Sequence, residues 1–228
     1  MAPEPLGDLP HLLREPRGEP LGALVLLHGR GADEADLHPL LAALDPGERL
    51  LGITPGAPIA GLAPGGRHWY AVQRVGFPHE ETFSGSMPAL RGFVDGVLEA
   101  RGIPWSRTIV GGFSQGAVMS YALTLGPSPP RPAGVLAMSG FLPTVPSWPL
   151  QPADAAGVPY WVSHGSRDEV IPVDFGRAAA RTLEDAGIDV TYLESEVAHV
   201  IDPGLLVPMR EWVEAALDES PETAPTPD

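Results

Sequence analysis

Apolar residues in this chain gather in short uninterrupted runs, and four of these runs end at a glycine-containing turn. Runs that are apolar on both faces predict central strands of a parallel sheet, because helices cover both sides of such strands. Two further runs at 50–54 and 190–193 predict two more strands, and 9–13 predicts an edge strand. The four glycine-terminated runs lie at 23–27, 108–110, 135–138 and 160–162.

Between these runs the apolar residues recur every three or four positions, which is the spacing of an amphipathic helix. Strands that alternate with helices indicate right-handed βαβ crossovers, and hence an α/β fold with an open, mostly parallel, doubly wound sheet. Ligands bind such sheets at the carboxyl ends of the strands, where the glycines of this chain cluster. The predicted helices span 34–44, 88–101, 115–125, 173–186 and 205–217.

Two stretches, 55–78 and 141–159, are irregular and longer than ordinary connections. Loops of this length in a compact domain are usually functional, so we expect them to cover a substrate rather than to link domains. The chain has 228 residues, 43% of them hydrophobic, which suits a single domain over 1–217. The acidic, proline-rich segment 218–228 predicts a disordered tail.

The formal net charge of −15 argues against nucleic acid or an anionic membrane as the main partner. Binding to phosphate groups is dominated by clustered cations, whereas the surface of this chain is expected to be acidic and solvated. The N-terminal sequence has no basic segment followed by an apolar one, and no stretch reaches about 18 uninterrupted apolar residues. We therefore expect a cytoplasmic protein without stable membrane insertion.

The chain contains no lysine, asparagine or cysteine, and its 14 basic residues are all arginines. Schiff-base chemistry, a Walker lysine, a Ser–Lys dyad and a thiol nucleophile are therefore excluded. The sequence has neither an HExxH motif nor a clustered pattern of histidines and carboxylates. It predicts no metal and no cofactor.

The strongest functional motif is Gly112-Phe113-Ser114-Gln115-Gly116, a GxSxG element between a β-prone run and a helical pattern. Its glycines allow a sharp strand-to-helix turn that exposes the serine hydroxyl at the carboxyl end of a buried strand. An α/β-hydrolase presents its nucleophile in this way, so Ser114 is the candidate nucleophile. The alternative interpretation is a tight turn whose serine only caps the following helix.

A serine hydroxyl is a weak nucleophile at neutral pH and needs a base, which in turn needs a carboxylate to orient it. In α/β-hydrolases the carboxylate lies between the serine and the histidine along the chain. Only His164 and His199 follow Ser114, and His199 is favoured because it lies in a loop after the last predicted strand. His164 is expected to pack at the end of a strand.

The carboxylate is expected in the loop after the strand at 160–164, where Asp168 is the leading candidate. Glu169 is its neighbouring rival, and Asp174 and Asp202 are weaker candidates. Asp168 would hold the imidazole in one tautomer and stabilise the imidazolium. The alternative role of this aspartate is to cap the helix that follows.

The negative oxygen that forms during acyl transfer needs two donors already aimed at it. The backbone N–H of Gln115 is one candidate, because it lies at the positive end of the helix after the nucleophile. The second is expected in the glycine-rich loop 27–33, with the backbone N–H of Arg30 as the candidate. The Arg30 guanidinium could meet an acidic substrate group, although an ion pair within the protein or at its surface is the favoured role.

Four aromatic residues lie in or beside the irregular stretches and are candidates for lining an acyl groove. Core packing or loop anchoring is an equally supported interpretation of such residues. The four are Trp69, Tyr70, Phe113 and Trp148.

Several separated motifs, taken together, resemble the phospholipase/carboxylesterase family, which includes the acyl-protein thioesterases. They are LLHGRGAD, GGRHWY, GGFSQGA, HGSRDEVIP and the terminal His199, and the resemblance runs from about residue 9 to residue 217. It implies an α/β-hydrolase without a large cap, often a homodimer, that cleaves carboxylic esters or thioesters. The family's triad and oxyanion donors would fall on the five candidate residues named above.

The chain departs from the acyl-protein thioesterases at four positions. Arg30 stands in place of leucine, Ala117 of a second glycine, Ala71 of an aspartate, and Ala198 of the glycine before the histidine. We therefore expect a serine carboxylesterase that hydrolyses small-molecule esters of short to medium acyl chains through an acyl-enzyme. An acyl-protein thioesterase or a lysophospholipase is the alternative. A non-catalytic binding protein on the same scaffold is a further alternative.

Overall fold

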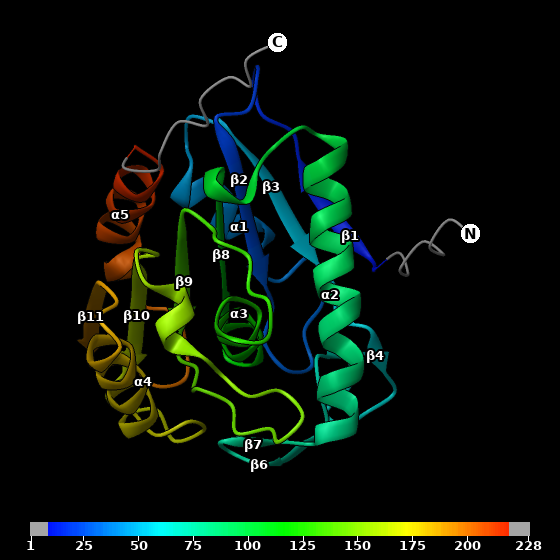
Figure 1. Cartoon of the computed structure of the whole chain (residues 1–228), viewed down its shortest axis with the longest axis vertical. Helices are drawn as coiled ribbons and strands as arrows, with labels where there is room; N and C mark the ends of the chain where they lie inside the picture. The colour runs from blue at the N-terminus through cyan, green and yellow to red at the C-terminus, as the bar shows by residue number, and fades with distance from the viewer. Residues whose placement is uncertain (1–8, 219–228) are drawn as a thin grey trace.

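The computed structural model of this chain describes residues 9–218 and contains a central seven-stranded sheet (Figure 1). Six neighbouring strands run parallel, and β1 at one edge pairs antiparallel with β3. The predicted α/β fold with a mostly parallel sheet is confirmed. The order across the sheet is β1 (His11–Arg14), β3 (Leu50–Pro55), β2 (Gly22–Leu27), β8 (Thr108–Phe113), β9 (Gly134–Met138), β10 (Tyr160–Gly165) and β11 (Val190–Ser195).

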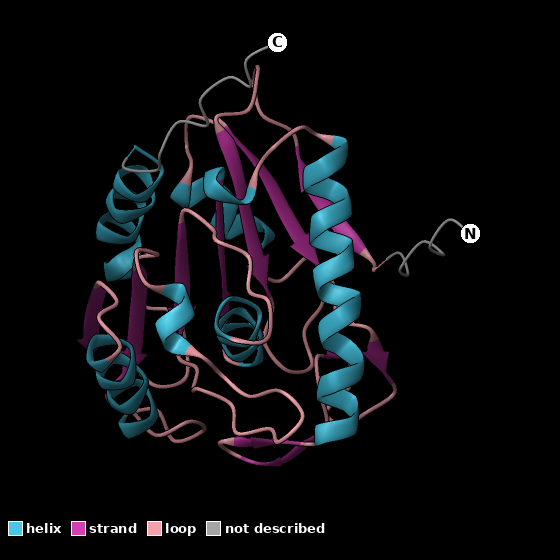
Figure 2. Cartoon of the chain, in the orientation of Figure 1, coloured by secondary structure: helices cyan, strands magenta, loops and turns pink. Residues whose placement is uncertain are grey.

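Helices cover both faces of the sheet (Figure 2). On one face, Leu41 of α1 and Met209 of α5 belong to the same buried cluster. On the other face, Leu90 of α2, Val118 of α3 and Leu183 of α4 are buried together. The bounds are α1 (His38–Leu44), α2 (Glu80–Ala100), α3 (Gln115–Leu125), α4 (Asp174–Asp185) and α5 (Leu206–Asp218).

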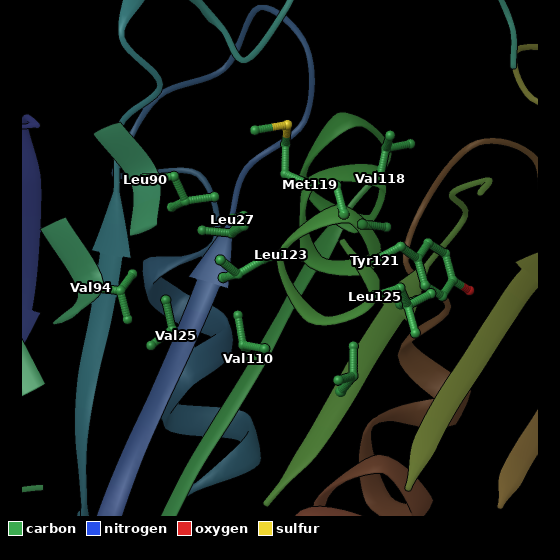
Figure 3. Packing of buried hydrophobic residues seen from close by; sticks show 14 of the residues in the cluster. Val25, Leu27, Leu90, Val94, Val110, Val118, Met119, Tyr121, Leu123 and Leu125 are labelled. Carbon is green, nitrogen blue, oxygen red and sulfur yellow. The ribbon is translucent and has the colours of Figure 1, made fainter. Parts of the chain in front are cut away.

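The strand β2 shows why the apolar runs are continuous. All six of its residues are buried. Val25 and Leu27 belong to the layer that contains α2 and α3, whereas Leu24 and Leu26 belong to the layer that contains α1 and α5. Successive side chains of a strand point to opposite faces, so a strand covered on both sides needs apolar residues at every position. Figure 3 shows Val25 and Leu27 beside Leu123 of α3.

The predicted helices differ from the observed ones mainly at their starts. The helix α3 has the predicted bounds, and α4 and α5 differ by one residue at each end. The helix α2 begins at Glu80, eight residues before the predicted start at Pro88. Pro88 lies inside the helix instead. Phe83 and Met87 in the added turns are buried, and their packing offsets the hydrogen bond that the proline cannot make.

The helix α1 begins at His38, later than the predicted start at 34. The residues before it form turns, in which the Asp33 carboxylate accepts a hydrogen bond from the N–H of Ala35 at 2.9 Å. Such local bonds between a short polar side chain and the backbone compete with helix formation. They account for the shorter helix.

The stretch 55–78 is more regular than its sequence predicts, because it contains four short strands in two antiparallel pairs. In Figure 1, β6 and β7 lie at the end of the molecule toward which the arrows of the main strands point. The stretch 141–159 contains one short 3-10 helix, Pro152–Ala155, and is otherwise irregular. The short strands are β4 (Ile59–Ala60), β5 (Arg67–His68), β6 (Val72–Arg74) and β7 (Phe77–Pro78).

None of the described helices is both long enough and apolar enough to cross a bilayer. The predicted tail 218–228 lies outside the described residues, except for Asp218 at the end of α5. The single domain over 1–217 stays a prediction.

Candidate active site

The GxSxG element forms the turn between β8 and α3. Ser114 lies between these two elements with φ 54° and ψ −116°, and a positive φ is uncommon for residues other than glycine. Its N–H donates to the carbonyl of Met138 at 2.9 Å, and its own carbonyl accepts from the N–H of Val118 at 3.1 Å. Its side chain makes no capping hydrogen bond to α3, so it does not act as a helix cap. The surrounding bonds hold the unusual backbone conformation in place.

The two glycines of the motif are required by close packing rather than by their own backbone angles. Neither has a positive φ. A Cβ at Gly116 would collide with the carbonyl oxygen of Leu27, and one at Gly112 would lie 2.5 Å from the backbone of Gly116. Any side chain at either position would therefore push the start of α3 away from the ends of β2 and β8.

Three side chains that are far apart in the sequence form a hydrogen-bonded chain beside this turn. His199 Nε2 lies 2.9 Å from Ser114 Oγ, and His199 Nδ1 lies 2.6 Å from Asp168 Oδ2. A carboxylate can only accept, so Nδ1 carries the proton and Nε2 accepts from the serine hydroxyl. The Asp168 side chain is fully buried, whereas that of His199 is 16% exposed. This arrangement can pass the hydroxyl proton to the imidazole and stabilise the resulting charge.

Asp168 is held by its own loop. Its Oδ1 accepts hydrogen bonds from the N–H groups of Val170 and Ile171, each at 2.8 Å, and its Oδ2 faces the imidazole of His199. It does not cap α4, because Val173 is the residue at that helix start. The two backbone donors fix the carboxylate in the orientation that the imidazole requires.

The rival carboxylates make other contacts or none. Glu169 is exposed. Asp174 pairs with Arg177 at 3.0 Å, and Asp202 accepts a hydrogen bond from the N–H of Gly204 at 2.8 Å. The structure therefore brings only one of the four candidate carboxylates to the imidazole.

The loop that carries His199 packs against the end of β10. The N–H of Arg167 donates to the carbonyl of Val197 at 3.0 Å. A Cβ at Gly165 would collide with the same Val197 carbonyl oxygen, so this glycine permits the close approach of the loop. The ring of Phe113 lies 4.8 Å from the imidazole of His199, measured between centroids. These contacts place the histidine over the serine.

A second histidine, His164, lies close to the same carboxylate. Its Nε2 donates to the carbonyl of Ile171 at 2.8 Å and lies 3.4 Å from Asp168 Oδ2. Its Nδ1 has no hydrogen-bond partner within the part of the chain that the structure describes. Burial lowers the pKa of His164, against weaker opposing effects of the Ile171 carbonyl and Asp168. His164 is thus a neutral imidazole packed at the end of β10, where the sequence places it.

The two candidate oxyanion donors lie in segments that flank Ser114. Within residues 9–218, neither the N–H of Arg30 nor that of Gln115 donates to a protein acceptor. The side chain of Gln115 is fully engaged, because it accepts from the N–H of Trp69 at 3.0 Å and donates to the carbonyl of Tyr70 at 2.9 Å. The Gln115 side chain therefore anchors the neighbouring loop, while its backbone N–H faces no protein acceptor.

His28 fixes the loop that carries Arg30. Its Nε2 accepts from the N–H of Ala57 at 2.9 Å, its Nδ1 bonds the carbonyl of Gly29 at 2.7 Å, and its own carbonyl accepts from the Trp69 indole at 2.9 Å. Because Nε2 is an acceptor, this set of bonds requires a neutral ring. Burial lowers the pKa of His28 and so favours that state.

The contacts of the Arg30 side chain differ from the ion pair that the sequence analysis favours. Among the described residues it forms no ion pair, although an ion pair is the role that the sequence favours. Its Nη2 donates instead to the carbonyl of Ala63 at 2.9 Å, and the side chain is exposed.

A pocket of about 350 Å³ opens beside Ser114 and His199. Apart from Ser114 and Gln115, its buried lining is apolar and includes Tyr70, Phe141 and Ile171. A concave apolar site beside a nucleophile suits the hydrocarbon part of an acyl group.

Two of the four aromatic candidates line this pocket, namely Tyr70 and Phe113. Trp69 is fully buried away from it, with its indole on the loop before Arg30. The indole of Trp148 donates to the carbonyl of Ala122 at 2.9 Å, which ties its loop to α3. These two tryptophans do not line this pocket, and their bonds fit loop anchoring, the other role that the sequence left open for them.

Several lining residues are missed by the sequence analysis. Phe141, Val75 and Arg74 lie in the two irregular stretches, where periodicity gives no indication of direction. Val170 and Ile171 follow Asp168 so closely that their position could have been anticipated once the carboxylate is placed. Within residues 9–218, no three His, Cys, Asp or Glu side chains are grouped so as to hold a metal ion.

A family model described as phospholipase/carboxylesterase matches residues 12–217. The chain belongs to the phospholipase/carboxylesterase family. One phospholipase/carboxylesterase relative, acyl-protein thioesterase 1 of Eremothecium gossypii, is 34% identical over 170 residues, which are 71% of this chain and 67% of that protein. The same enzyme of Debaryomyces hansenii is 29% identical over 145 residues, which are 59% of this chain and 62% of that protein. The chain thus spans less than two thirds of the length of the Debaryomyces hansenii protein.

Among solved structures, the carboxylesterase of Bacillus cereus has a TM-score of 0.78 to this chain at 22% identity, covering 91% of this chain and 94% of that one. This likeness concerns the fold. It confirms the α/β-hydrolase fold, and no large cap domain is evident in residues 9–218. The family expected from the separated motifs is the phospholipase/carboxylesterase family that the comparison identifies.

Proposed function

We propose that this member of the family is a serine esterase with Ser114 as nucleophile, His199 as general base and Asp168 as the orienting carboxylate. The observation that carries the proposal is the pair of hydrogen bonds, 2.9 and 2.6 Å long, that joins these side chains. An aligned base removes the hydroxyl proton as the bond to the carbonyl carbon forms, which makes a weak nucleophile effective. The buried carboxylate holds the productive tautomer and stabilises the imidazolium.

The reaction has two halves. Ser114 Oγ bonds to the acyl carbon while its proton passes to His199 Nε2, and the tetrahedral intermediate then expels the alcohol, which takes that proton. A water molecule attacks the resulting acyl-serine and gives its proton to Nε2. The second tetrahedral intermediate releases the carboxylic acid as Ser114 recovers its proton, so the enzyme returns to its starting state.

The backbone N–H groups of Arg30 and Gln115 are the proposed donors to the oxygen of both intermediates. Support comes from their lack of a protein acceptor and from the position of Gln115 at the positive end of α3. The bonds of His28 and of the Gln115 side chain hold both segments before any substrate arrives. Donors that need no rearrangement are the most effective at stabilising developing charge.

The substrate class follows from the pocket. A volume of about 350 Å³ with an apolar buried lining favours short to medium acyl chains over long ones. Each buried methylene group contributes about 0.8 kcal/mol, so affinity should rise with chain length until the pocket is full. An open groove of about 480 Å³, which shares Phe113 and His199 with this pocket, would receive the alcohol.

A panel of 4-nitrophenyl esters from acetate to dodecanoate tests the proposal. We expect kcat/KM to rise with chain length, pass through a maximum and fall. We expect Ser114→Ala to abolish turnover and labelling by a fluorophosphonate while its thermal unfolding stays that of the wild type. Undiminished turnover in this variant would reject Ser114, and a wild-type chain that neither turns over nor labels would favour a binding protein.

Thioester hydrolysis is the second candidate, because the relatives from Debaryomyces hansenii and Eremothecium gossypii are named acyl-protein thioesterases. Octanoyl esters and octanoyl thioesters with matched leaving groups separate the two activities, and a lysophospholipid separates both from a lysophospholipase. The homodimer and the cytoplasmic location stay predictions, which sedimentation and cell fractionation would measure.

A further inference from the structure

The arginines of this acidic protein are mostly neutralised by carboxylates. The chain has 14 arginines and 29 Asp and Glu residues. Eight arginines have a carboxylate oxygen of a described residue within 4.0 Å, and the other six have none among residues 9–218. Because carboxylates outnumber arginines about two to one in this chain, we ask what else each unpaired arginine could bind. The paired ones are Arg14, Arg17, Arg49, Arg67, Arg91, Arg101, Arg167 and Arg177.

Two of the six unpaired arginines have structural bonds to the backbone. Arg107 donates to the carbonyls of Leu21 and Leu217. Arg131 donates to two carbonyls around the 3-10 helix of the irregular stretch 141–159. Two more, Arg181 on α4 and Arg210 on α5, do not line the pocket beside Ser114.

The last two, Arg30 and Arg74, both line that pocket. Both are exposed, so they form part of its rim, whereas Tyr70 and Ile171 form part of its buried wall. They come from separate segments, the loop after β2 and the strand β6. Two arginines from different parts of the chain thus lie at one opening.

Each of these guanidinium groups is oriented but not neutralised. Arg30 uses one nitrogen on the Ala63 carbonyl, at 2.9 Å. Arg74 lies with its guanidinium carbon 3.7 Å from the centroid of the Phe77 ring, a contact that occupies the face of the group and leaves its N–H edges available. The positive charge of Arg30 also acts on the Tyr70 hydroxyl, lowering its pKa against the larger raising effect of burial.

The other charged groups at this opening do not cancel the two arginines. Asp36 is the one carboxylate among the described lining residues, and it makes no ion pair with either guanidinium. The remaining titratable groups of the described lining are the Tyr70 hydroxyl and the imidazole of His199. The rim is therefore cationic in a protein whose net charge is −15.

We propose that the pocket takes acyl groups that carry a carboxylate at their far end, with Arg30 and Arg74 binding that carboxylate. The apolar wall would hold the methylene chain between the ester carbon at Ser114 and the rim. Planar guanidinium groups match the two oxygens of a carboxylate, and such charge-assisted hydrogen bonds are stronger than neutral ones. This inference rests on the proposed esterase function and names its substrate class as monoesters of dicarboxylic acids.

The test compares chain-matched pairs of substrates. The 4-nitrophenyl monoesters of succinic, adipic and suberic acid are set against 4-nitrophenyl butanoate, hexanoate and octanoate, at pH 7.5 and low salt. The readout is the kcat/KM of the acid divided by that of the neutral ester of equal length. We expect Arg74→Gln to lower this ratio about threefold to tenfold at the best chain length. Added salt should lower the wild-type ratio and affect that of the variant less.

Arg181→Gln is the matched control, since it removes the charge of another unpaired arginine away from the pocket. It should leave the ratio at the wild-type value, and both variants should unfold at the wild-type temperature. A ratio that is the same in the wild type and Arg74→Gln overturns the proposal, as does an equal fall in both variants. If the neutral esters are hydrolysed in a Ser114-dependent manner in that case, only this inference fails, whereas no hydrolysis of any ester removes the esterase proposal itself.

A carboxylate on the alcohol side is the competing placement. This placement is tested by comparing the octanoyl ester of 4-hydroxybenzoic acid, whose alcohol carries a carboxylate, with the octanoyl ester of methyl 4-hydroxybenzoate, whose alcohol is neutral. If Arg74→Gln lowers the preference for the charged alcohol and not the preference for the charged acyl group, the proposed placement is wrong.

Discussion

Two histidines of this protein lie near the same carboxylate oxygen, yet their surroundings differ. His199 Nδ1 is 2.6 Å and His164 Nε2 is 3.4 Å from Asp168 Oδ2. His199 is partly exposed and its second nitrogen faces Ser114, whereas His164 is fully buried and its second nitrogen has no partner among the described residues. Proximity to an aspartate therefore does not define a general base. A base also needs an acceptor nitrogen that faces the nucleophile.

The difference between the two histidines originates in the elements that carry them. His164 belongs to β10, so its position is set by strand pairing, and a Cβ at Gly176 of α4 would lie 2.6 Å from its Nδ1. His199 belongs to the loop after β11, which backbone bonds hold over the end of the sheet. The first ring supports the carboxylate loop from inside, and the second reaches the serine from the surface.

The sharpest test of the comparison is replacement of each histidine in turn. We expect His199→Ala to lower kcat on the order of 10⁴-fold, because no other described base contacts Ser114 Oγ. We expect His164→Leu to lower kcat less than about tenfold, because His164 acts only through the loop of Asp168. Steady-state hydrolysis of a 4-nitrophenyl ester measures both. Equal losses in the two variants would show that the histidines do not have separate roles.

The carboxylate they share is the next test. We expect Asp168→Asn to lower kcat about 10³- to 10⁴-fold, because an amide can donate to the imidazole and so favour the wrong tautomer. Glu169→Gln provides the matched control, since this neighbour is exposed, and it should retain wild-type kcat. Near-normal activity of Asp168→Asn, measured on the same ester, would contradict the orienting role.

These contacts also show what the sequence can predict. The order of strands and helices follows from the apolar runs, and the GxSxG turn follows from the collision that any Cβ at Gly116 would cause. The candidates Ser114, Asp168 and His199 follow from their order along the chain and their places after predicted strands. In each case the backbone, or a whole strand or helix, tolerates few residue types at a position, and this restriction is visible in the sequence.

The pocket wall leaves no such pattern. Phe141 and Arg74 lie in stretches without periodicity, and their direction depends on how the loops fold against each other. Trp69 and Trp148 are aromatic, as groove residues often are, but their indole groups bond to backbone carbonyls and do not line the pocket. The expected ion pair of Arg30 is absent from the described residues for the same reason. Whether an arginine meets a carboxylate depends on which residues surround it in the folded chain, and the spacing of residues along the sequence does not determine this.

The structural role of His164 should appear in stability rather than in turnover. We expect His164→Leu to lower the free energy of unfolding by about 1–3 kcal/mol, because the buried carbonyl of Ile171 loses its donor. His164→Gln retains an N–H donor and should recover part of that loss. Urea denaturation at pH 7.5 measures both variants. A leucine variant as stable as the wild type would mean that the Ile171 bond contributes nothing to folding.

The smallest expected effect is the pH dependence that the buried histidines create. Burial lowers the pKa of His164 below its ordinary 6.5, and the same holds for His28, so the unfolded chain binds protons below that pH more readily than the native one. Stability therefore rises with pH in the window below 6.5 and is lost as the pH falls toward the native pKa values. Each histidine contributes at most about 1.4 kcal/mol per pH unit.

Comparing urea denaturation at pH 7.5 and pH 5.5 separates the contributions of His28 and His164 to stability. The wild type should lose stability on acidification, and His164→Leu should lose less, because only His28 still resists protonation. The difference should be on the order of 1 kcal/mol, since Asp168 and Glu194 partly favour the charged form of His164. A variant whose stability falls as steeply as that of the wild type would mean that His164 takes up its proton equally in both states. The two imidazoles near Asp168 would then differ in position alone and not in electrostatic environment.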